Sequence, residues 1–359
     1  MPAVTKDDVL DALRRVNDPE LHKDLVTLNM IKNVELDNGT VRIGVELTTP
    51  ACPLKDQIRG DVEREVKKLD GVTNVEIDWS AQVRQTANLQ AHLPGVKNTI
   101  AIGAGKGGVG KSTVAVFAAV GLAREGAKVG LLDADIYGPS IPKMLGIENE
   151  KPFVRDEKIM PIEVADIKVM SMGFMVEPDK AVIWRGPMVH GVIKQFLDQV
   201  EWGELDYLII DLPPGTGDVP LTLAQSLPMT GAVVVCTPQA VALLDATKAL
   251  RMYQQLNVDI LGMVENMSHF VAPDTGKEYD LFGRGGAKAA AERLSVPFLG
   301  EIPINIAIRK SGDEGKPAAN FEETDDATRV SIISLVRNLA GQVSIKNATQ
   351  AATVELKIT

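Results

Sequence analysis

Cysteine and aromatic residues are scarce in this chain. Its 359 residues include two cysteines, Cys52 and Cys236, and aromatic side chains make up 4% of the sequence. Two thiols cannot build a disulfide framework, and one chain alone cannot supply four thiolates to a metal. The apolar residues are mostly small or aliphatic, a composition typical of parallel strands covered by closely packed helices.

Positive charge and long apolar runs are also lacking. The formal net charge is -10 and the pI is about 5.1, which argues against binding to nucleic acid or to an anionic membrane surface as a main activity. No apolar run is long enough to span a bilayer, and the start of the chain shows neither a secretory signal nor a transit peptide pattern. We therefore expect a cytoplasmic protein without a nucleic-acid or membrane partner.

Residues 1–79 predict a small α+β domain, because amphipathic helical stretches alternate there with short strand-like runs. The expected elements are a helix from near Thr5, a hairpin of 31–36 and 41–47 around an Asn38-Gly39 turn, a helix over 53–68 and a strand over 72–77.

A larger domain is expected over 99–341, after a linker at 80–98 and before a C-terminal tail at 342–359. Short apolar runs alternate with helical stretches in this domain, which predicts an α/β fold with a mostly parallel sheet flanked by helices. The runs lie at 99–102, 129–132, 167–170, 207–210, 232–236, 260–264 and 298–302.

The strongest motif follows the first of these runs. Residues 105–112 have the pattern G-x-x-x-x-G-K-S, in the strand-loop-helix context that a P-loop requires. The main-chain N–H groups of such a loop surround phosphate oxygens, while the lysine faces the outer phosphates and the serine hydroxyl joins a magnesium ion. The predicted nucleotide-binding residues are Gly105, Lys106, Gly107, Gly108, Val109, Gly110, Lys111, Ser112 and Thr113. A P-loop NTPase that binds ATP with Mg2+ is therefore expected.

The same segment also fits a weaker pattern. Gly103, Gly105 and Gly108 satisfy G-x-G-x-x-G, and Asp133 follows where a dinucleotide site places its ribose-binding acid. A dinucleotide site has no use for Lys111 and Ser112, whereas a triphosphate site needs both. ATP is the favoured ligand.

Aspartates follow two of the predicted strands. Asp133 and Asp135 come after the run at 129–132, and Asp211 comes after the run at 207–210. We expect Asp135 to orient an attacking water, Asp133 to support the metal or the P-loop, and Asp211 to hold magnesium through water. Helix capping is the alternative for each of them, but two such strand ends beside a P-loop favour catalysis.

Lys106 stands where a general P-loop tolerates any residue. A solvated side chain is one interpretation. The other is that Lys106 meets phosphate charge, including that of a nucleotide bound by a second subunit, as an arginine finger does in trans. The candidate catalytic residues are therefore Lys106, Lys111 and Asp135.

Three motifs carry a family resemblance: GKGGVGKST at 105–113, DADIYGPS at 133–140 and DLPPGTGD at 211–218. With them the chain resembles the deviant Walker A ATPases and, more narrowly, the Mrp/ApbC-type iron-sulfur cluster carriers. The match continues through WRGPM at 184–188, TPQ at 237–239, VENMSHF at 264–270 and GEIP at 300–303. The N-terminal segment, with Asp18-Pro19-Glu20 and the Cys52 motif LTTPACP, is similar to a small iron-sulfur assembly domain that often precedes this ATPase.

The resemblance implies a homodimer around two ATP molecules, with Lys106 crossing the interface. It implies Asn266 as an adenine contact, for which a turn-forming asparagine is the alternative interpretation. It also implies partners of two kinds, an iron-sulfur scaffold and client apoproteins.

One departure from the family concerns the iron ligands. Such carriers place a Cys-x-x-Cys pair shortly after the Asn-Met-Ser run and hold a 4Fe-4S cluster between two subunits, whereas this chain has Ala272 and Thr275 at those positions. Cys52 remains as an iron-sulfur ligand candidate, because a helix beginning at Pro53 would lower its thiol pKa, although an ordinary half-buried cysteine is the alternative. Cys236 is expected to be a core residue.

His269 and Asp274 lie next to the absent cysteine pair, where they could ligate iron, but surface polar residues in a loop are the favoured interpretation. Two functions remain open. The first is an ATP-hydrolysing factor for iron-sulfur cluster assembly or delivery that acts as a nucleotide-gated homodimer. The second is a metal-free regulatory switch that recruits a protein partner when ATP drives dimerisation.

Overall fold

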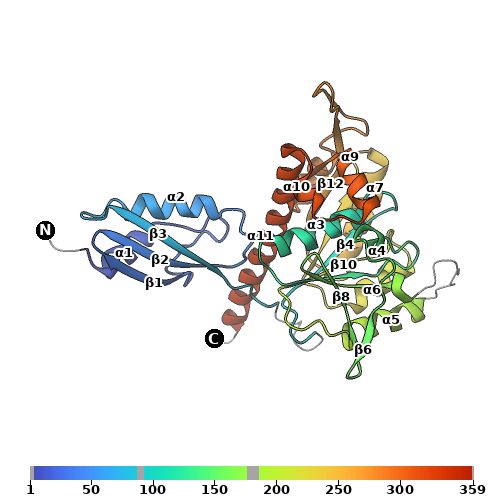
Figure 1. The fold of residues 1–359 in the computed structure, drawn as a ribbon, viewed down its shortest axis with the longest axis horizontal. Coiled ribbons are helices and arrows are strands. Elements are labelled where there is room, and N and C mark those ends of the chain that lie inside the picture. Colours follow the sequence, from blue (N-terminus) through green and yellow to red (C-terminus); the bar gives the residue numbers. More distant parts are fainter. Residues whose placement is uncertain (1–3, 87–92, 176–185, 358–359) are drawn as a thin grey trace. The chain divides into compact units, whose positions relative to one another are not determined.

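The computed structural model describes residues 4–86, 93–175 and 186–357, which form two compact units (Figure 1). One unit contains residues 1–84 and 344–359, and the other contains residues 85–343. The expected motif at Trp184 and Arg185 and the part of the expected linker at 87–92 lie outside the described residues.

The smaller unit has a three-stranded sheet covered by two helices, in the order α1 (Lys6–Leu13), β1 (Ile31–Asp37), β2 (Thr40–Leu47), α2 (Lys55–Val66) and β3 (Asn74–Ala81). Strands β1 and β2 are antiparallel, and β2 and β3 are parallel. Asn38 and Gly39 adopt positive φ angles of 44° and 85°, which confirms the predicted hairpin turn. Val9 and Leu13 of α1 and Ile58 of α2 belong to one core cluster with buried residues of the sheet.

The larger unit is built on a nine-stranded sheet whose central strands run parallel. The strands are β4 (Thr99–Ala104), β5 (Val129–Asp133), β8 (Ile162–Val164), β9 (Ile167–Ser171), β10 (Tyr207–Asp211), β11 (Gly231–Cys236), β12 (Ile260–Val271), β13 (Glu278–Tyr279) and β14 (Phe298–Ile304). The order is β13-β12-β11-β4-β10-β5-β9-β8, with β14 also paired to β12. All seven predicted strands are present, and the predicted α/β class is confirmed.

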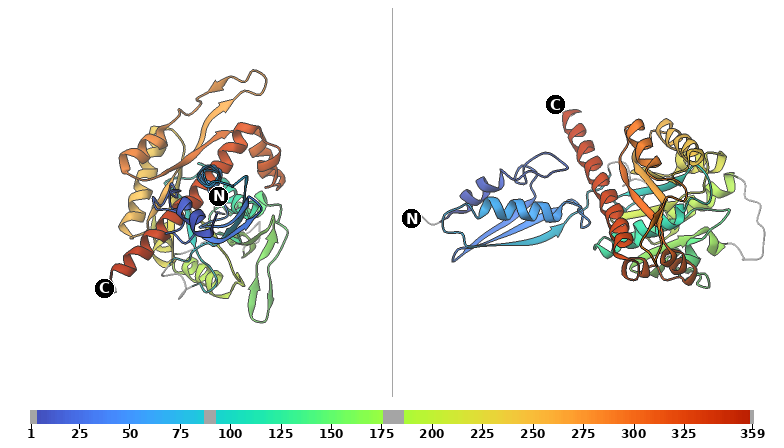
Figure 2. Two further views of the ribbon diagram at one scale, coloured as in Figure 1. Left: turned by 90° about the vertical axis from the view of Figure 1, so that its left-hand side faces the viewer. Right: turned by 90° about the horizontal axis from the view of Figure 1, so that it is seen from above.

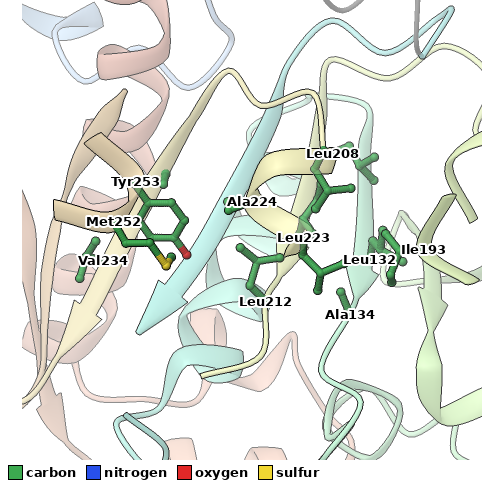
Figure 3. Packing of buried hydrophobic residues seen from close by; sticks show 14 of the residues in the cluster. Leu132, Ala134, Ile193, Leu208, Leu212, Leu223, Ala224, Val234, Met252 and Tyr253 are labelled. Atoms are coloured by element: carbon green, nitrogen blue, oxygen red, sulfur yellow. The ribbon is translucent and has the colours of Figure 1, made fainter. Parts of the chain in front are cut away.

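Helices cover both faces of this sheet. They are α3 (Lys111–Arg124), α4 (Ile141–Met144), α5 (Gly186–Gln199), α6 (Asp218–Ser226), α7 (Ala240–Gln255), α8 (Gly286–Leu294), α9 (Ile306–Glu314), α10 (Ala319–Glu322) and α11 (Asp326–Lys357). Helices α5, α6, α7 and α8 share one core with the strands. Ile193 and Leu223 lie in the same part of this core as Leu132, and Tyr253 lies in another part with Met252 and Val234 (Figure 3). Helix α3 packs on β4, β5 and β10, and its Phe117 meets Phe321 of α10 edge to face.

Two short ribbons project from the larger unit (Figure 2). One joins β6 (Phe153–Arg155) and β7 (Lys158–Met160), and the other joins the end of β12 to β13. Strands β6, β7, β8 and β13 are two or three residues long. A strand of that length is too short to show a periodic pattern in the sequence.

The segments at the domain borders are more ordered than their polar composition indicated. Thr86 is buried and its hydroxyl contacts Asn98 and Thr230, so the end of the expected linker packs on the larger unit. Helix α11 continues to Lys357, so the expected tail at 342–359 is helical over most of its length. Within the described ranges, none of the helices combines the length and apolar content that crossing a lipid bilayer would need.

Candidate nucleotide-binding and catalytic site

The P-loop connects the end of β4 to the start of α3. Gly108 and Gly110 adopt φ angles of 78° and 80°, a left-handed conformation that favours glycine. Gly110 is the N-cap of α3 and offers no side-chain hydrogen bond, so the first N–H groups of the helix are left for a ligand. A Cβ at Gly105 would lie 2.2 Å from the main-chain carbonyl of Asp245 in α7, so the loop lies directly on that helix.

Lys111 is held between two carboxylates. Its ammonium nitrogen lies 2.6 Å from Oδ1 of Asp211 and 3.4 Å from Oδ2 of Asp135, and 6% of its side chain is exposed. The hydroxyl of Ser112 donates to the other oxygen of Asp211 at 2.6 Å. The sheet explains this meeting, because β10 lies between β4 and β5 and all three parallel strands end at the same edge. The structure thus brings together Lys111, Ser112 and Asp211, which the sequence analysis singled out for the phosphates and the metal, with Asp135, which it singled out for the attacking water.

Asp133 is completely buried behind this group. It accepts hydrogen bonds from the main-chain N–H groups of Asp135 and Ile141 and from the hydroxyl of Ser171. Burial, and then the negative charge of Asp211, raise the pKa of Asp133. Burial also raises the pKa of Asp211, against the opposing effect of Lys111. Two carboxylates, those of Asp211 and Asp135, therefore face the ammonium group of Lys111, and Asp133 is buried behind them.

The donor set suits a magnesium ion. Ser112 and Asp211 offer hard oxygen atoms, which Mg2+ prefers, and a divalent cation would compensate the carboxylates that face Lys111. The cradle of glycines at the start of α3 suits phosphate groups. A cavity of about 420 Å3 lies over this cradle, lined by the P-loop and by Asp135, Tyr137, Met144 and Pro214.

Lys106 also lines this cavity. Its side chain is half-buried, and among the described residues no salt bridge involves it, in contrast to Lys111. The geometry leaves the ammonium group of Lys106 available for a charge from outside the chain.

Asn266 lies on β12 at the side of the P-loop. Its side-chain amide donates to the carbonyl of Val109 at 2.9 Å, and 6% of the residue is exposed. The next residue, Met267, has a positive φ of 57° where the pairing of β12 with β14 becomes irregular. Asn266 therefore fastens the P-loop, a role that the sequence analysis did not include, and its adenine contact stays a prediction.

Cys52 lies in the smaller unit and differs from the expected reactive thiol. Helix α2 begins at Lys55 with Leu54 as its N-cap, so Cys52 precedes the helix by three residues. It is buried, and burial raises the pKa of its thiol to about 11, with a further contribution from the nearby Glu20 carboxylate. The expectation of a lowered pKa was wrong, because desolvation outweighs the helix N-terminus.

The remaining candidate ligands are dispersed. Cys236 lies in the core cluster, as expected, and burial raises the pKa of its thiol to about 12. His269 is buried on β12 with its ring nitrogen 2.9 Å from the Ser268 hydroxyl, so the expectation of a surface loop was wrong for this residue. Asp274 is exposed in the turn between β12 and β13. The residues that the structure describes contain no group of three or more His, Cys, Asp or Glu side chains placed to hold a metal ion.

Comparison with known proteins assigns this site to a family. Residues 95–348 match the family of NUBPL iron-transfer P-loop NTPases. The chain belongs to this family. Residues 6–77 match the iron-sulfur cluster assembly protein family, which confirms the resemblance of both segments.

Relatives along the whole length have the same assignment. The chain is 52% identical to an iron-sulfur cluster carrier protein from Synechocystis over 349 residues, which are 95% of this chain and 99% of the relative. It is 50% identical to a protein of that name from Deinococcus radiodurans, over 96% of this chain and 97% of the relative. The chain is thus a member of an iron-sulfur cluster carrier and assembly factor family with a P-loop NTPase fold.

A solved structure is also similar to this chain. The nucleotide-binding protein from Archaeoglobus fulgidus, a complex with ADP in which cobalt was found, is 43% identical to this chain. The similarity covers 67% of this chain and 93% of that protein, with a TM-score of 0.59.

Replacement of Gly105 tests the P-loop geometry. The added methyl group in Gly105→Ala would collide with the main chain of α7, which cannot move aside as a side chain can, so we expect ATP affinity to fall more than about tenfold. In Gly107→Ala the nearest atom to the new Cβ is 3.9 Å away, and the loss should be much smaller. Calorimetric titration with Mg-ATP measures both. Equal losses in the two variants would contradict the packing described for Gly105.

The pH dependence of Cys52 alkylation tests the burial of this thiol. The pKa rises from an ordinary value of 9.0 to about 11, so the thiolate population at pH 8 should be about a hundredfold lower in the folded protein than in urea. Iodoacetamide alkylation of Cys236→Ala protein, in which Cys52 is the remaining thiol, measures this. The rate should reach half its maximum near pH 11 in the folded protein and near pH 9 in the unfolded protein. A half-maximal rate at or below pH 9 in the folded protein would contradict the burial effect.

Proposed function

We propose that this chain binds and hydrolyses ATP, and that the reaction controls iron-sulfur cluster assembly or delivery to apoproteins by a homodimer. The observation that carries the proposal is the Lys111, Ser112 and Asp211 group under the P-loop cradle. Family membership supports the iron-sulfur part. The cytoplasmic location stays a prediction from the sequence.

The chemistry needs few protein groups, because phosphoryl transfer depends mainly on positioning and on charge stabilisation. Magnesium, when bound, would supply positive charge that neutralises the outer phosphates. Lys111 exchanges its contacts with Asp211 and Asp135 for phosphate oxygens, and Asp135 then accepts a hydrogen bond from the attacking water. Ser112 and Asp211 would hold the magnesium ion that accompanies the nucleotide.

Lys106 completes the site from the second subunit. A free ammonium group beside the cavity is suited to neutralise the charge that develops on the transferred phosphate. Because each subunit would provide this lysine to the other, hydrolysis would occur only in the dimer.

The cargo is held less firmly than in carriers with a cysteine pair. Ala272 and Thr275 cannot supply thiolates, and Cys52 remains protonated near neutral pH because of its raised pKa. We therefore assign to Cys52 a transient contact with a cluster, shared with a client or with a second chain. The same two observations favour the alternative function, a metal-free switch in which ATP-driven dimerisation recruits a protein partner.

A mixture of two inactive variants tests hydrolysis and the exchange of Lys106 together. Lys106→Ala and Asp135→Asn should each lose most turnover and keep ATP binding, whereas Lys128→Ala, which replaces an exposed lysine elsewhere on the unit, should not. If Lys106 acts in trans, the mixture contains dimers with one complete site, and about a quarter of the wild-type rate should return. A mixture as inactive as its components, from proteins shown to exchange subunits, would contradict the role in trans.

Anaerobic reconstitution separates the two functions. Wild-type protein incubated with iron and sulfide should show visible absorption from thiolate-to-iron charge transfer, and Cys52→Ala should show much less. Cys236→Ala provides the control, because that thiol belongs to the core. Wild-type protein that shows no such absorption even during the incubation would contradict the contact at Cys52 and favour the metal-free switch, whereas loss of iron on desalting would exclude stable binding alone.

A further inference from the structure

Ser171, at the end of β9, lies behind the catalytic group and is completely buried. Its hydroxyl donates to Oδ2 of Asp133 at 2.9 Å and accepts from the main-chain N–H of Gly173 at 2.9 Å. A serine hydroxyl can make both bonds at once, whereas alanine makes neither. Ser171 therefore links Asp133, at the end of β5, to the chain that follows β9.

Asp133 in turn holds both ends of the loop that carries Asp135. Its Oδ1 accepts from the N–H of Asp135 at 3.2 Å, and its Oδ2 accepts from the N–H of Ile141 at 3.3 Å. Within the loop, Asp135 accepts from the N–H groups of Tyr137 and Gly138. The position of Asp135 over the P-loop thus depends on the orientation of one buried carboxylate.

A packing contact supports the same connection. A Cβ at Gly173 would lie 3.3 Å from Cβ of Pro139, which belongs to the loop, and 3.2 Å from the Ser171 hydroxyl oxygen. The loop therefore rests on the residues after β9 as well as on Asp133. Ser171 lies where these two contacts meet.

We propose that Ser171 is a positioning residue for ATP hydrolysis, which fixes Asp133 and through it the loop that places Asp135 against the attacking water. The inference rests on the proposed role of Asp135. Among the described residues, Ser171 is the one side chain recorded as donating to Asp133, since the other two donors are main-chain groups of the loop itself. Without the Ser171 hydroxyl, the carboxylate is held by the loop alone, and a small displacement of a catalytic group slows the chemical step strongly.

The effect should fall on kcat, because the hydrogen bonds of the Ser171 hydroxyl among the described residues go to Asp133 and Gly173 and not to the P-loop or Lys111. In Ser171→Ala we expect kcat to fall about 10- to 100-fold, as for a small misplacement of a catalytic group, with the ATP dissociation constant within about threefold of wild type. Ser171→Thr keeps the hydroxyl, and Ser171→Val introduces a side chain of the same shape as threonine but without the hydroxyl. The threonine variant should therefore exceed the valine variant in kcat by about tenfold or more.

Thr230→Val controls for the loss of a buried hydroxyl. Thr230 is also completely buried and accepts from the N–H of Thr99, at the opposite end of β4 from the P-loop. In Thr230→Val the free energy of unfolding in urea should fall, as in Ser171→Ala, while kcat should stay at the wild-type value.

The experiment is a steady-state ATPase assay on the full chain, with calorimetric ATP binding for each variant and Asp135→Asn in parallel. Provided that wild type is active and Asp135→Asn is not, either of two results would overturn the inference. One is a wild-type kcat in Ser171→Ala, and the other is an equal kcat in Ser171→Thr and Ser171→Val. Equal losses in kcat and ATP affinity, without recovery in Ser171→Thr, would also overturn it, because they indicate a structural role. No hydrolysis by wild type, or full hydrolysis by Asp135→Asn, would instead overturn the proposed function.

Discussion

The buried ion pair between Lys111 and Asp211 is the interaction on which the site depends. An ammonium group with 6% of its side chain exposed is stable only because a carboxylate lies 2.6 Å away, with a second at 3.4 Å. Asp211 also receives the Ser112 hydroxyl, so the groups expected to bind phosphate and metal bind one another in this structure. Under the proposed function, a bound nucleotide would break this pair, and the cation that accompanies the nucleotide would compensate Asp211 when Lys111 leaves.

The parallel sheet provides the geometry for that exchange. Strands β4, β10 and β5 lie side by side, and the chain reverses after each one at the same edge, where the P-loop, Asp211 and Asp135 follow. Helix α7 supports the P-loop from outside, with its main chain against Gly105, and Asn266 holds the loop at Val109. Tyr253, from the same helix, fills the space beside β4 that a side chain at Gly103 would occupy. The glycines before and within the loop therefore serve close packing as well as phosphate binding.

The motifs that depend on local spacing could be predicted from the sequence. The P-loop is contiguous, the aspartates follow apolar runs, and the seven predicted strands are long enough to be recognised. The features that were missed depend on contacts between distant segments. Ser171 follows a strand without any motif around it, and its bond to Asp133 joins residues 38 positions apart. The bond from Asn266 to Val109 spans 157 positions.

The expectation for Cys52 failed for a different reason. Pro53 is a good first-turn residue, but α2 begins at Lys55, and burial then dominates the thiol pKa. The continuation of α11 to Lys357 could not be predicted because its apolar residues do not form a single stripe.

The central claim is that Lys111 exchanges its carboxylate partners for phosphate when a nucleotide binds. Its most direct test is calorimetric titration of the protein with ATP in Mg2+ and in EDTA. The account predicts binding at least about tenfold tighter with Mg2+, since Asp211 otherwise loses the compensating charge of Lys111. Equal affinity in EDTA, or no binding in Mg2+, would contradict it.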